Sequence, residues 1–225
     1  VVLSIPDFAY LDMPYVPHPQ EGGYDWASRS VDTRQVFGFM TDNLPANAAS
    51  IKNTLARPQT IADPEPREAG RGIAGVQAQL WSETTRTDAG VDYQLFPRLI
   101  ALAERGWHQP KWEPAYQPGA RYSYDDSRVD KSAIDADWNA FAGRMPVQFA
   151  LLDKLGVAYR ITPPGAKIVD GMLEANTEYP EQAIEYRTVG GAWQAYSGPV
   201  AVDGAVEVRA RSADGRRASR TVTVP

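Results

Sequence analysis

Trp81 and Glu83 stand two positions apart, directly after a short apolar run. The indole of a tryptophan offers a flat apolar face to the C–H groups of a sugar ring, and a carboxylate accepts hydrogen bonds from sugar hydroxyls. The pair could therefore bind a carbohydrate. A second interpretation is that Glu83 is an acidic residue near a helix start, where the helix dipole favours negative charge. The chemistry of the two residues leaves both open.

A long segment near the start of the chain supplies further candidates. The segment from Tyr10 to Tyr15 leads into the sequence VPHPQEGGYDWASRS, which is too rich in Pro and Gly for regular structure and long enough to be a functional loop. Among the aromatic residues here, Trp26 either packs the loop onto the rest of the domain or forms a platform for a ligand ring. Both interpretations remain open for Trp26.

The composition excludes several kinds of chemistry. The net charge is −5 and the pI is about 5.1, which argues against a nucleic-acid partner because phosphate binding needs a basic surface. The chain has no Cys, so a thiol nucleophile, a disulfide and a thiolate zinc site are unavailable. Its two histidines, His18 and His108, lie far apart beside prolines, so we expect neither a metal site nor a Ser-His pair. We expect no cofactor, and no apolar run is long enough to predict a transmembrane helix.

Alternating strands and helices must position these candidate residues. Apolar runs predict strands at 1–8 and 73–80. Helical spacing predicts a helix at 31–40, a second short helix at 45–55, and a helix that Asp92 caps and that ends at Gly106. A loop is predicted at 58–72. This order is typical of a parallel α/β domain, in which ligands bind at the carboxyl ends of the strands. All the candidates above fall on that side.

The second half of the chain has a different pattern. Helical spacing predicts one long helix from Val129 to Leu155, kinked at Pro146 and ended by Gly156, with its aromatic residues in the core. The composition changes at Thr162, and we therefore predict two domains, 1–160 and 161–225.

Residues 161–225 are expected to form a small antiparallel β domain, with a sandwich as the predicted architecture. Alternating apolar residues flank a Gly190-Gly191 turn and an Asp214-Gly215 turn, which are strong hairpin signals. The arginines of this region alternate with buried positions, which favours a solvated sheet face over a binding patch; they are Arg209, Arg211, Arg216, Arg217 and Arg220.

The segments AYLDMPY, GYDWASR, QLWSET and FPRLIALAERGW, in this order, resemble the C-terminal part of the catalytic domain of glycoside hydrolase family 20, the β-N-acetylhexosaminidases, and specifically its bacterial chitobiase branch. The tail from residue 184 is similar to the immunoglobulin-like domain that follows the barrel in chitobiases. The resemblance implies a (β/α)₈ TIM barrel, of which 1–8 is strand seven, 73–80 strand eight and 91–106 helix eight.

The resemblance also implies a mechanism. In this family the 2-acetamido oxygen of the substrate attacks C1 to give an oxazolinium, while a glutamic acid protonates the leaving oxygen. By resemblance, Tyr10 donates to the acetamido oxygen, Trp81 forms part of the pocket wall, and Glu83 accepts from the O4 and O6 hydroxyls. Trp26 matches the aromatic residue that stacks on the next sugar. The implied ligand is an N-acetylhexosamine-containing oligosaccharide, such as a chitooligosaccharide cleaved at its non-reducing end.

One departure from the family concerns the catalytic acid. The family's Asp-Glu pair lies on an earlier strand, and no Asp-Glu dipeptide occurs in this sequence; the family's sugar-gripping arginine near strand one is absent too. We therefore expect a natural or artificial fragment of a longer enzyme, which needs the N-terminal remainder as its partner and is inactive alone. The family further implies a periplasmic or secreted location. The alternative function is a non-catalytic carbohydrate-binding or accessory module.

Overall fold

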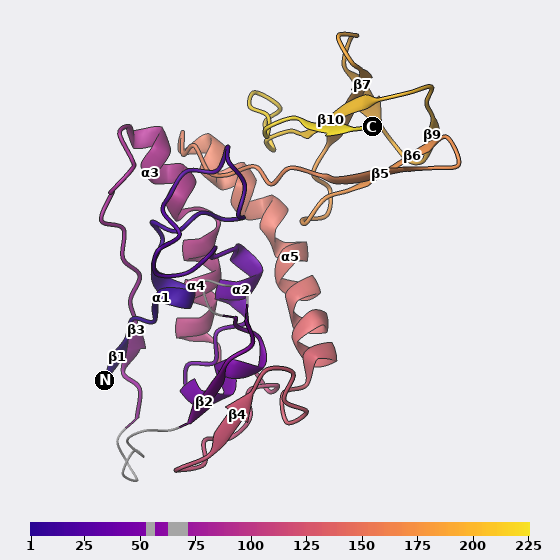
Figure 1. Cartoon of the computed structure of the whole chain (residues 1–225). Coiled ribbons are helices and arrows are strands. Elements are labelled where there is room, and N and C mark those ends of the chain that lie inside the picture. Colours follow the sequence, from indigo (N-terminus) through magenta and orange to yellow (C-terminus); the bar gives the residue numbers. More distant parts are fainter. Residues whose placement is uncertain (53–56, 63–71) are drawn as a thin grey trace. The chain divides into compact units, whose positions relative to one another are not determined.

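The protein folds as a mixed α/β part followed by antiparallel β-sheets, which confirms the predicted fold class (Figure 1). The computed structural model describes residues 1–52, 57–62 and 72–225. The elements are, in chain order, β1 (Val2–Leu3), α1 (Pro6–Ala9), α2 (Thr33–Phe37), the 3₁₀ helix η1 (Leu44–Ala49), β2 (Thr60–Ala62), β3 (Gly75–Val76), α3 (Asp88–Leu95), α4 (Arg98–Trp107), β4 (Arg121–Ser123), α5 (Lys131–Lys154), β5 (Gly165–Val169), β6 (Met172–Asn176), β7 (Ile184–Thr188), β8 (Gln194–Tyr196), β9 (Val200–Ala201), β10 (Val206–Ala210) and β11 (Val222–Val224).

The chain divides into two compact units, Val1–Trp138 and Asn139–Pro225, and the division falls inside α5. The domain boundary at 160 and 161 stays a prediction. Within the described ranges, none of the helices combines the length and apolar content needed to cross a membrane.

A parallel pair of strands organises the first unit. Val2 of β1 pairs with Gly75 of β3, and an isolated parallel bridge joins Tyr10 to Gln79 further along. The predicted strands 1–8 and 73–80 are correct in place and wrong in length. The first strand stops early because Pro6 starts the short helix α1, a position where the missing N–H of proline costs nothing.

Two helices replace the single one predicted between Asp92 and Gly106. Helix α3 starts earlier than predicted, because Thr87 caps it by accepting a hydrogen bond from the amide of Gly90 at 3.1 Å. Pro97 then separates α3 from α4: it disfavours helical backbone at Phe96, which is extended with φ −107° and ψ 135°.

The remaining elements of this unit are short. Helix α2 is confirmed within 31–40, with Asp32 as its cap, and η1 occupies the first part of the predicted helix 45–55. The loop predicted at 58–72 instead begins with β2, which pairs antiparallel with β4. The rest of these two predictions, at 53–56 and 63–71, lies outside the described residues.

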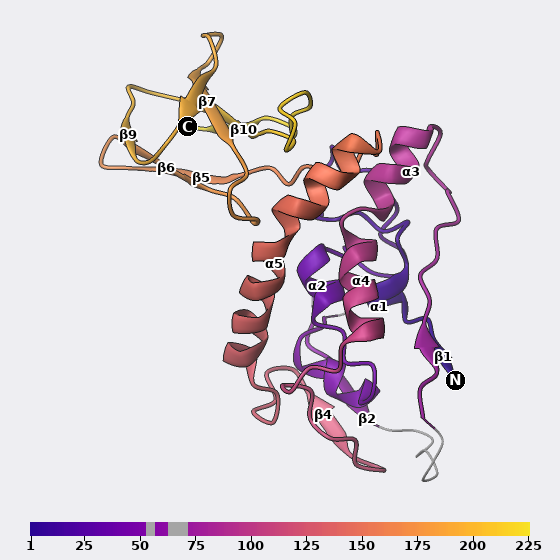
Figure 2. The same cartoon turned by 180° about the vertical axis from the view of Figure 1, so that it is seen from behind.

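The core of the first unit is aromatic and lies where α2 runs beside α4 (Figure 2). Phe8 of α1 stacks on Phe39 with ring centroids 4.5 Å apart. Phe37 of α2 makes an edge contact of 5.4 Å with Trp138 in the first half of α5. The aromatic stripe of α5 is therefore core, as its spacing predicted.

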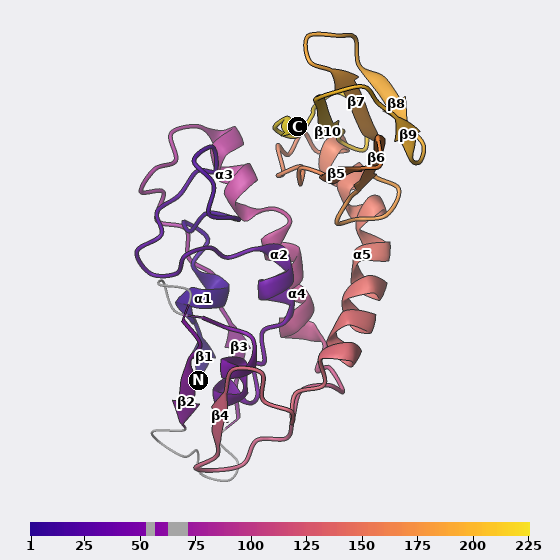
Figure 3. The same cartoon turned by 45° about the vertical axis from the view of Figure 1, so that its right-hand side comes forward.

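The second unit is a β-sandwich (Figure 3), as predicted. One sheet has the order β11-β10-β7-β8 and the other β5-β6-β9. Leu173 from the second sheet and Val206, Val208 and Val224 from the first form the core between them. Both predicted hairpins are confirmed, since β7 pairs with β8 across Gly190 and β10 pairs with β11.

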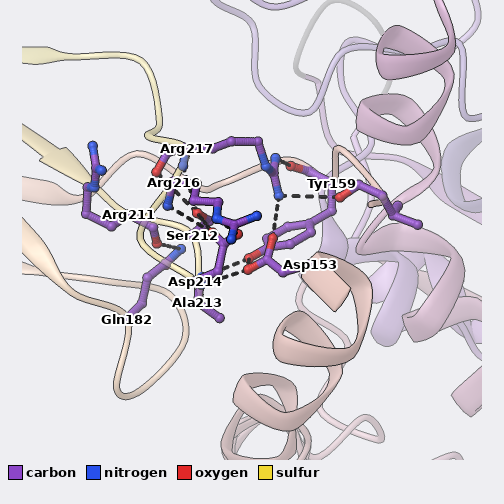
Figure 4. Close-up of polar contacts among 10 residues, drawn as sticks. Asp153, Tyr159, Gln182, Arg211, Ser212, Ala213, Asp214, Arg216 and Arg217 are labelled. Carbon is purple, nitrogen blue, oxygen red and sulfur yellow. Dashed lines mark hydrogen bonds and ion pairs between the residues drawn. The ribbon is translucent and has the colours of Figure 1, made fainter. Parts of the chain in front are cut away.

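The end of α5 is fastened to the turn that joins β10 to β11 (Figure 4). The Asp153 carboxylate pairs with the guanidinium of Arg217 at 3.0 Å, and it accepts from the amide of Asp214 at 2.9 Å and from the hydroxyl of Tyr159 at 3.2 Å. The Tyr159 oxygen in turn accepts from the amide of Ala213 at 3.1 Å. This cluster makes the second half of α5 part of the sandwich unit.

Two arginines on the sheet face form cross-strand ion pairs. Arg209 pairs with Glu185 at 2.7 Å and Arg187 pairs with Glu207 at 2.6 Å. Both guanidinium groups also lie over the ring of Trp193. Their charge is therefore balanced within the sheet, which favours a structural role.

Candidate functional site

Tyr10 lies where the two segments that follow β1 and β3 run side by side. The amide of Leu11 donates to the carbonyl of Gln79, and the amide of Gln79 donates to the carbonyl of Ala9, both at 2.8 Å. These bonds on either side of Tyr10 fix its backbone. Its side chain is 8% exposed, so the phenol is a buried group with one edge at the surface.

The structure brings three of the four predicted site residues together. The indole Nε1–H of Trp26 donates to Oε2 of Glu83 at 3.1 Å. The ring of Tyr10 meets that of Trp26 at a centroid distance of 5.3 Å and an interplanar angle of 72°. Trp26 remains 61% exposed, so it contacts both neighbours while presenting much of its indole to solvent. We call Tyr10, Trp26, Trp81 and Glu83 the aromatic-carboxylate wall.

Trp81 joins this wall through its backbone. Its side chain is 71% exposed and makes no ring contact or hydrogen bond within the described ranges. Its amide donates to Oδ2 of Asp12 at 2.6 Å. The bond therefore holds the backbone at Trp81, while the indole itself is open to a ligand.

Asp12 is a site residue that the sequence reasoning missed. It is buried, and its carboxylate accepts hydrogen bonds from the amides of both Trp81 and Glu83, the second at 3.3 Å. Ser82 between them has φ 59°, a left-handed backbone that a serine adopts at a cost. One carboxylate thus holds the turn that carries two predicted binding residues.

Burial and the nearby charges of Glu83 and Asp12 raise the pKa of the Tyr10 phenol. The phenol therefore stays protonated over an even wider pH range than a free tyrosine and remains a hydrogen-bond donor. The Tyr10 hydroxyl bonds to no residue in the described part of the chain. It is chemically suited to donate to a ligand oxygen.

The loop that carries Trp26 is closed at its base. The amide of Val31 donates to the carbonyl of Pro14 at 2.9 Å. Gly23 packs directly on the segment after Tyr10: its φ is +117°, and a Cβ there would lie 2.3 Å from the carbonyl oxygen of Asp12. Only glycine fits this approach, which brings the loop back over the site.

The histidines take no part in the wall. Nδ1 of His18 accepts from the amide of Gln20 at 3.1 Å. Among the residues that the structure describes, no group of three or more His, Cys, Asp and Glu side chains has an arrangement suited to a metal ion.

Comparison with known families matches both parts of the chain. The model of the glycosyl hydrolase family 20 catalytic domain matches residues 1–110. Residues 1–110 belong to glycosyl hydrolase family 20. The model of the chitobiase/β-hexosaminidase C-terminal domain matches residues 148–221, so the family predicted for the tail is confirmed as well.

Family 20 relatives match at substantial identity. The chain is 39% identical over 227 residues to N,N'-diacetylchitobiase of Vibrio harveyi, which covers 100% of this chain and 25% of that protein. It is 39% identical over 208 residues to a β-hexosaminidase of Vibrio vulnificus, covering 87% of this chain and 24% of the relative. It is 45% identical over 146 residues to β-hexosaminidase B of Pseudoalteromonas piscicida, covering 63% of this chain and 19% of that protein. The chain thus spans about a quarter or less of the length of these family 20 relatives.

Proposed function

We propose that this chain acts as part of a longer β-N-acetylhexosaminidase, in which it binds the terminal non-reducing N-acetylhexosamine of a chitooligosaccharide. The observation that carries the proposal is the contact of Tyr10, Trp26 and Glu83, which combines a protonated phenol, an open indole face and a carboxylate. Sugar rings are bound by this combination of aromatic surface and hydrogen-bonding groups.

Each side chain has a role that its geometry supports. The Tyr10 hydroxyl, buried and kept protonated by a raised pKa, donates to the acetamido oxygen and holds it below C1. The carboxylate of Glu83 has two oxygens, and its bond to Trp26 leaves capacity to accept from sugar hydroxyls. The exposed indole of Trp81 packs against the sugar, and that of Trp26 against the following one.

The reaction is substrate-assisted and retains the anomeric configuration. The acetamido oxygen attacks C1 and forms an oxazolinium while an acid protonates the leaving oxygen, and water then opens the oxazolinium. This sequence has no Asp-Glu dipeptide to supply the acid and the acetamide-orienting carboxylate. The proposal therefore assigns those steps to the remainder of the longer protein, and export to the periplasm or the medium belongs to the same proposal.

The test uses the longer protein beside the 225-residue chain, with p-nitrophenyl N-acetyl-β-glucosaminide as substrate. We expect turnover by the longer protein only, and loss of about 10²-fold in kcat on Tyr10→Phe, the size expected for removing one donor to a reacting oxygen. Normal turnover by Tyr10→Phe would contradict the role of Tyr10. If the longer protein binds N-acetylglucosamine and cleaves nothing, the chain belongs to a carbohydrate-binding module instead.

A further inference from the structure

Arg98, at the start of α4, is fully buried behind the site. Its Nη1 donates to the carbonyls of Met13 at 2.8 Å and Val31 at 3.0 Å, and its Nη2 donates to the carbonyl of Leu11 at 2.7 Å. Its Nε donates to the carbonyl of Gln94, near the end of α3, at 3.0 Å. One guanidinium therefore links α4 to α3 and to three carbonyls outside both helices.

The carbonyls of Leu11, Met13 and Val31 belong to the two segments that lead into and out of the Trp26 loop. Leu11 and Met13 lie on either side of Asp12, the residue that holds the turn of Trp81 and Glu83. Val31 directly follows the loop, and its amide donates to the carbonyl of Pro14. Arg98 thus ties together the base of the loop that carries Trp26 and the segment that carries Asp12.

The contacts at position 98 require the guanidinium group of arginine. The planar guanidinium has five N–H donors in a fixed fork, whereas a lysine ammonium is a single point with three donors. The guanidinium carbon also lies 3.9 Å from the ring centroid of Tyr15, a cation–π contact that covers its flat face. A lysine could not reach carbonyls of both loop ends and keep that contact.

We propose that Arg98 is a positioning residue for the sugar site, acting through the Trp26 loop and through Asp12. Arg98 is fully buried and contacts no sugar, and its effect on binding rests on the proposed function. Its effect on the position of Trp26 does not, because the bond from Trp26 to Glu83 exists without a ligand.

Arg105 is a matched control on the same helix. It is 3% exposed, and its guanidinium lies over Phe37 at 4.4 Å and Trp112 at 5.3 Å, on the core side of α4. Arg105→Lys replaces a guanidinium by an ammonium on the same helix, as Arg98→Lys does. It leaves the carbonyls of the Trp26 loop untouched.

The experiment compares Arg98→Lys with Arg105→Lys in the 225-residue chain by ¹H–¹⁵N NMR of its six tryptophan indoles. The Trp26 signal is assigned from Trp26→Phe. We expect Arg98→Lys to shift the Trp26 indole signal and to speed its exchange with solvent at least about tenfold, while Arg105→Lys leaves it in place. An unchanged Trp26 signal in folded Arg98→Lys overturns the proposal, and so does an equal change in Arg105→Lys.

Two further experiments cover a failure of Arg98→Lys to fold and separate the positioning role from sugar binding. If Arg98→Lys does not fold, Tyr15→Leu removes the ring beneath the guanidinium, together with its hydroxyl and its edge contact with Tyr93. A smaller shift of the Trp26 signal in the same direction supports the proposal, and an unchanged signal overturns it. N-acetylglucosamine is then titrated into the longer protein and its Arg98→Lys variant, with affinity expected to fall about tenfold. A Trp26 signal that responds to Arg98→Lys in a protein that binds no sugar would reject the proposed function and leave the positioning role standing.

Discussion

The indole of Trp26 donates to Oε2 of Glu83 at 3.1 Å across 57 positions of the chain. The two residues come from different loops, one following β1 and the other following β3. Because the carboxyl ends of parallel strands meet at one edge, the loops that follow them can share a ligand. The bond therefore joins the two loops that carry the proposed sugar-binding residues.

Removing the acceptor of this bond should weaken sugar binding. Glu83→Ala frees the Trp26 indole and removes an acceptor for sugar hydroxyls, so the Kd of the longer protein for N-acetylglucosamine should rise about tenfold, or ~1.4 kcal/mol, in calorimetric titration. Glu83→Gln keeps one acceptor oxygen and should give an intermediate Kd. An unchanged Kd in Glu83→Ala would remove Glu83 from the site.

Asp12→Ala should release the turn of Trp81 and Glu83. Two backbone amides lose a buried acceptor, which should lower the free energy of unfolding of the first unit by about 1–3 kcal/mol in urea. Hydrogen exchange at the amides of Trp81 and Glu83 should accelerate. Asp25→Ala, an exposed carboxylate of the Trp26 loop, is the control and should change neither quantity. Protection of both amides in Asp12→Ala would show that the turn holds without the carboxylate.

Gly143→Ala should stabilise α5. Gly143 is inside the helix, and a Cβ there would have no atom within 4 Å, so the change restricts the unfolded chain without a clash. The expected gain is about 0.5–1 kcal/mol, seen as a higher melting temperature. Gly23→Ala should act in the opposite direction, since its Cβ would meet the carbonyl oxygen of Asp12 at 2.3 Å. A lower melting temperature for Gly143→Ala would mean that the helix needs glycine for another reason.

Tyr159 should make the sandwich unit sensitive to alkali. Burial, together with the charge of Asp153, raises its pKa to about 12 from an ordinary value of 10.0. Because the folded state holds this proton more tightly, the contribution to stability is complete below about pH 10 and is lost as the pH rises toward 12. The loss should be roughly 1–3 kcal/mol.

The measurement for Tyr159 is denaturant unfolding at pH 8, 10 and 11. Tyr159→Phe should be less stable at pH 8 because it loses the bonds to Asp153 and Ala213, and it should decline less between pH 10 and 11 than the unchanged protein. Tyr24→Phe removes an exposed phenol and should follow the unchanged protein. Parallel decline of all three proteins would contradict the role of Tyr159.

Long periodic segments and turn residues were predictable from the sequence. The helix predicted at 129–155 is α5, and the alternating residues around Asp214-Gly215 form β10 and β11 in the expected register. A third hairpin, β5 with β6, was missed although it carries the same signal: Asp170 and Gly171 have φ of 51° and 73° at its turn.

The candidate site was predictable in its residue types and not in its connections. Tyr10, Trp26 and Glu83 follow from their chemistry and from the family resemblance, yet the path of a loop rich in Pro and Gly decides that Trp26 reaches Glu83. Asp12 and Arg98 act on backbone groups that any residue possesses. The sequence carries no signal for such backbone partners, because almost every residue offers the same amide donor and carbonyl acceptor.

The second half of α5 has a consequence for how the β-sandwich could be moved into another protein. Phe149 stacks on Tyr159 at 4.7 Å and meets Tyr179 edge-on at 5.0 Å, and Asp153 binds the turn from Asp214 to Arg217. A sandwich excised at residue 161 would leave behind Phe149, Asp153 and Tyr159, and so lose the contacts that they make with Tyr179 and Arg217. The smallest transplantable piece therefore begins with helix, at or before residue 148, where the C-terminal domain family also begins.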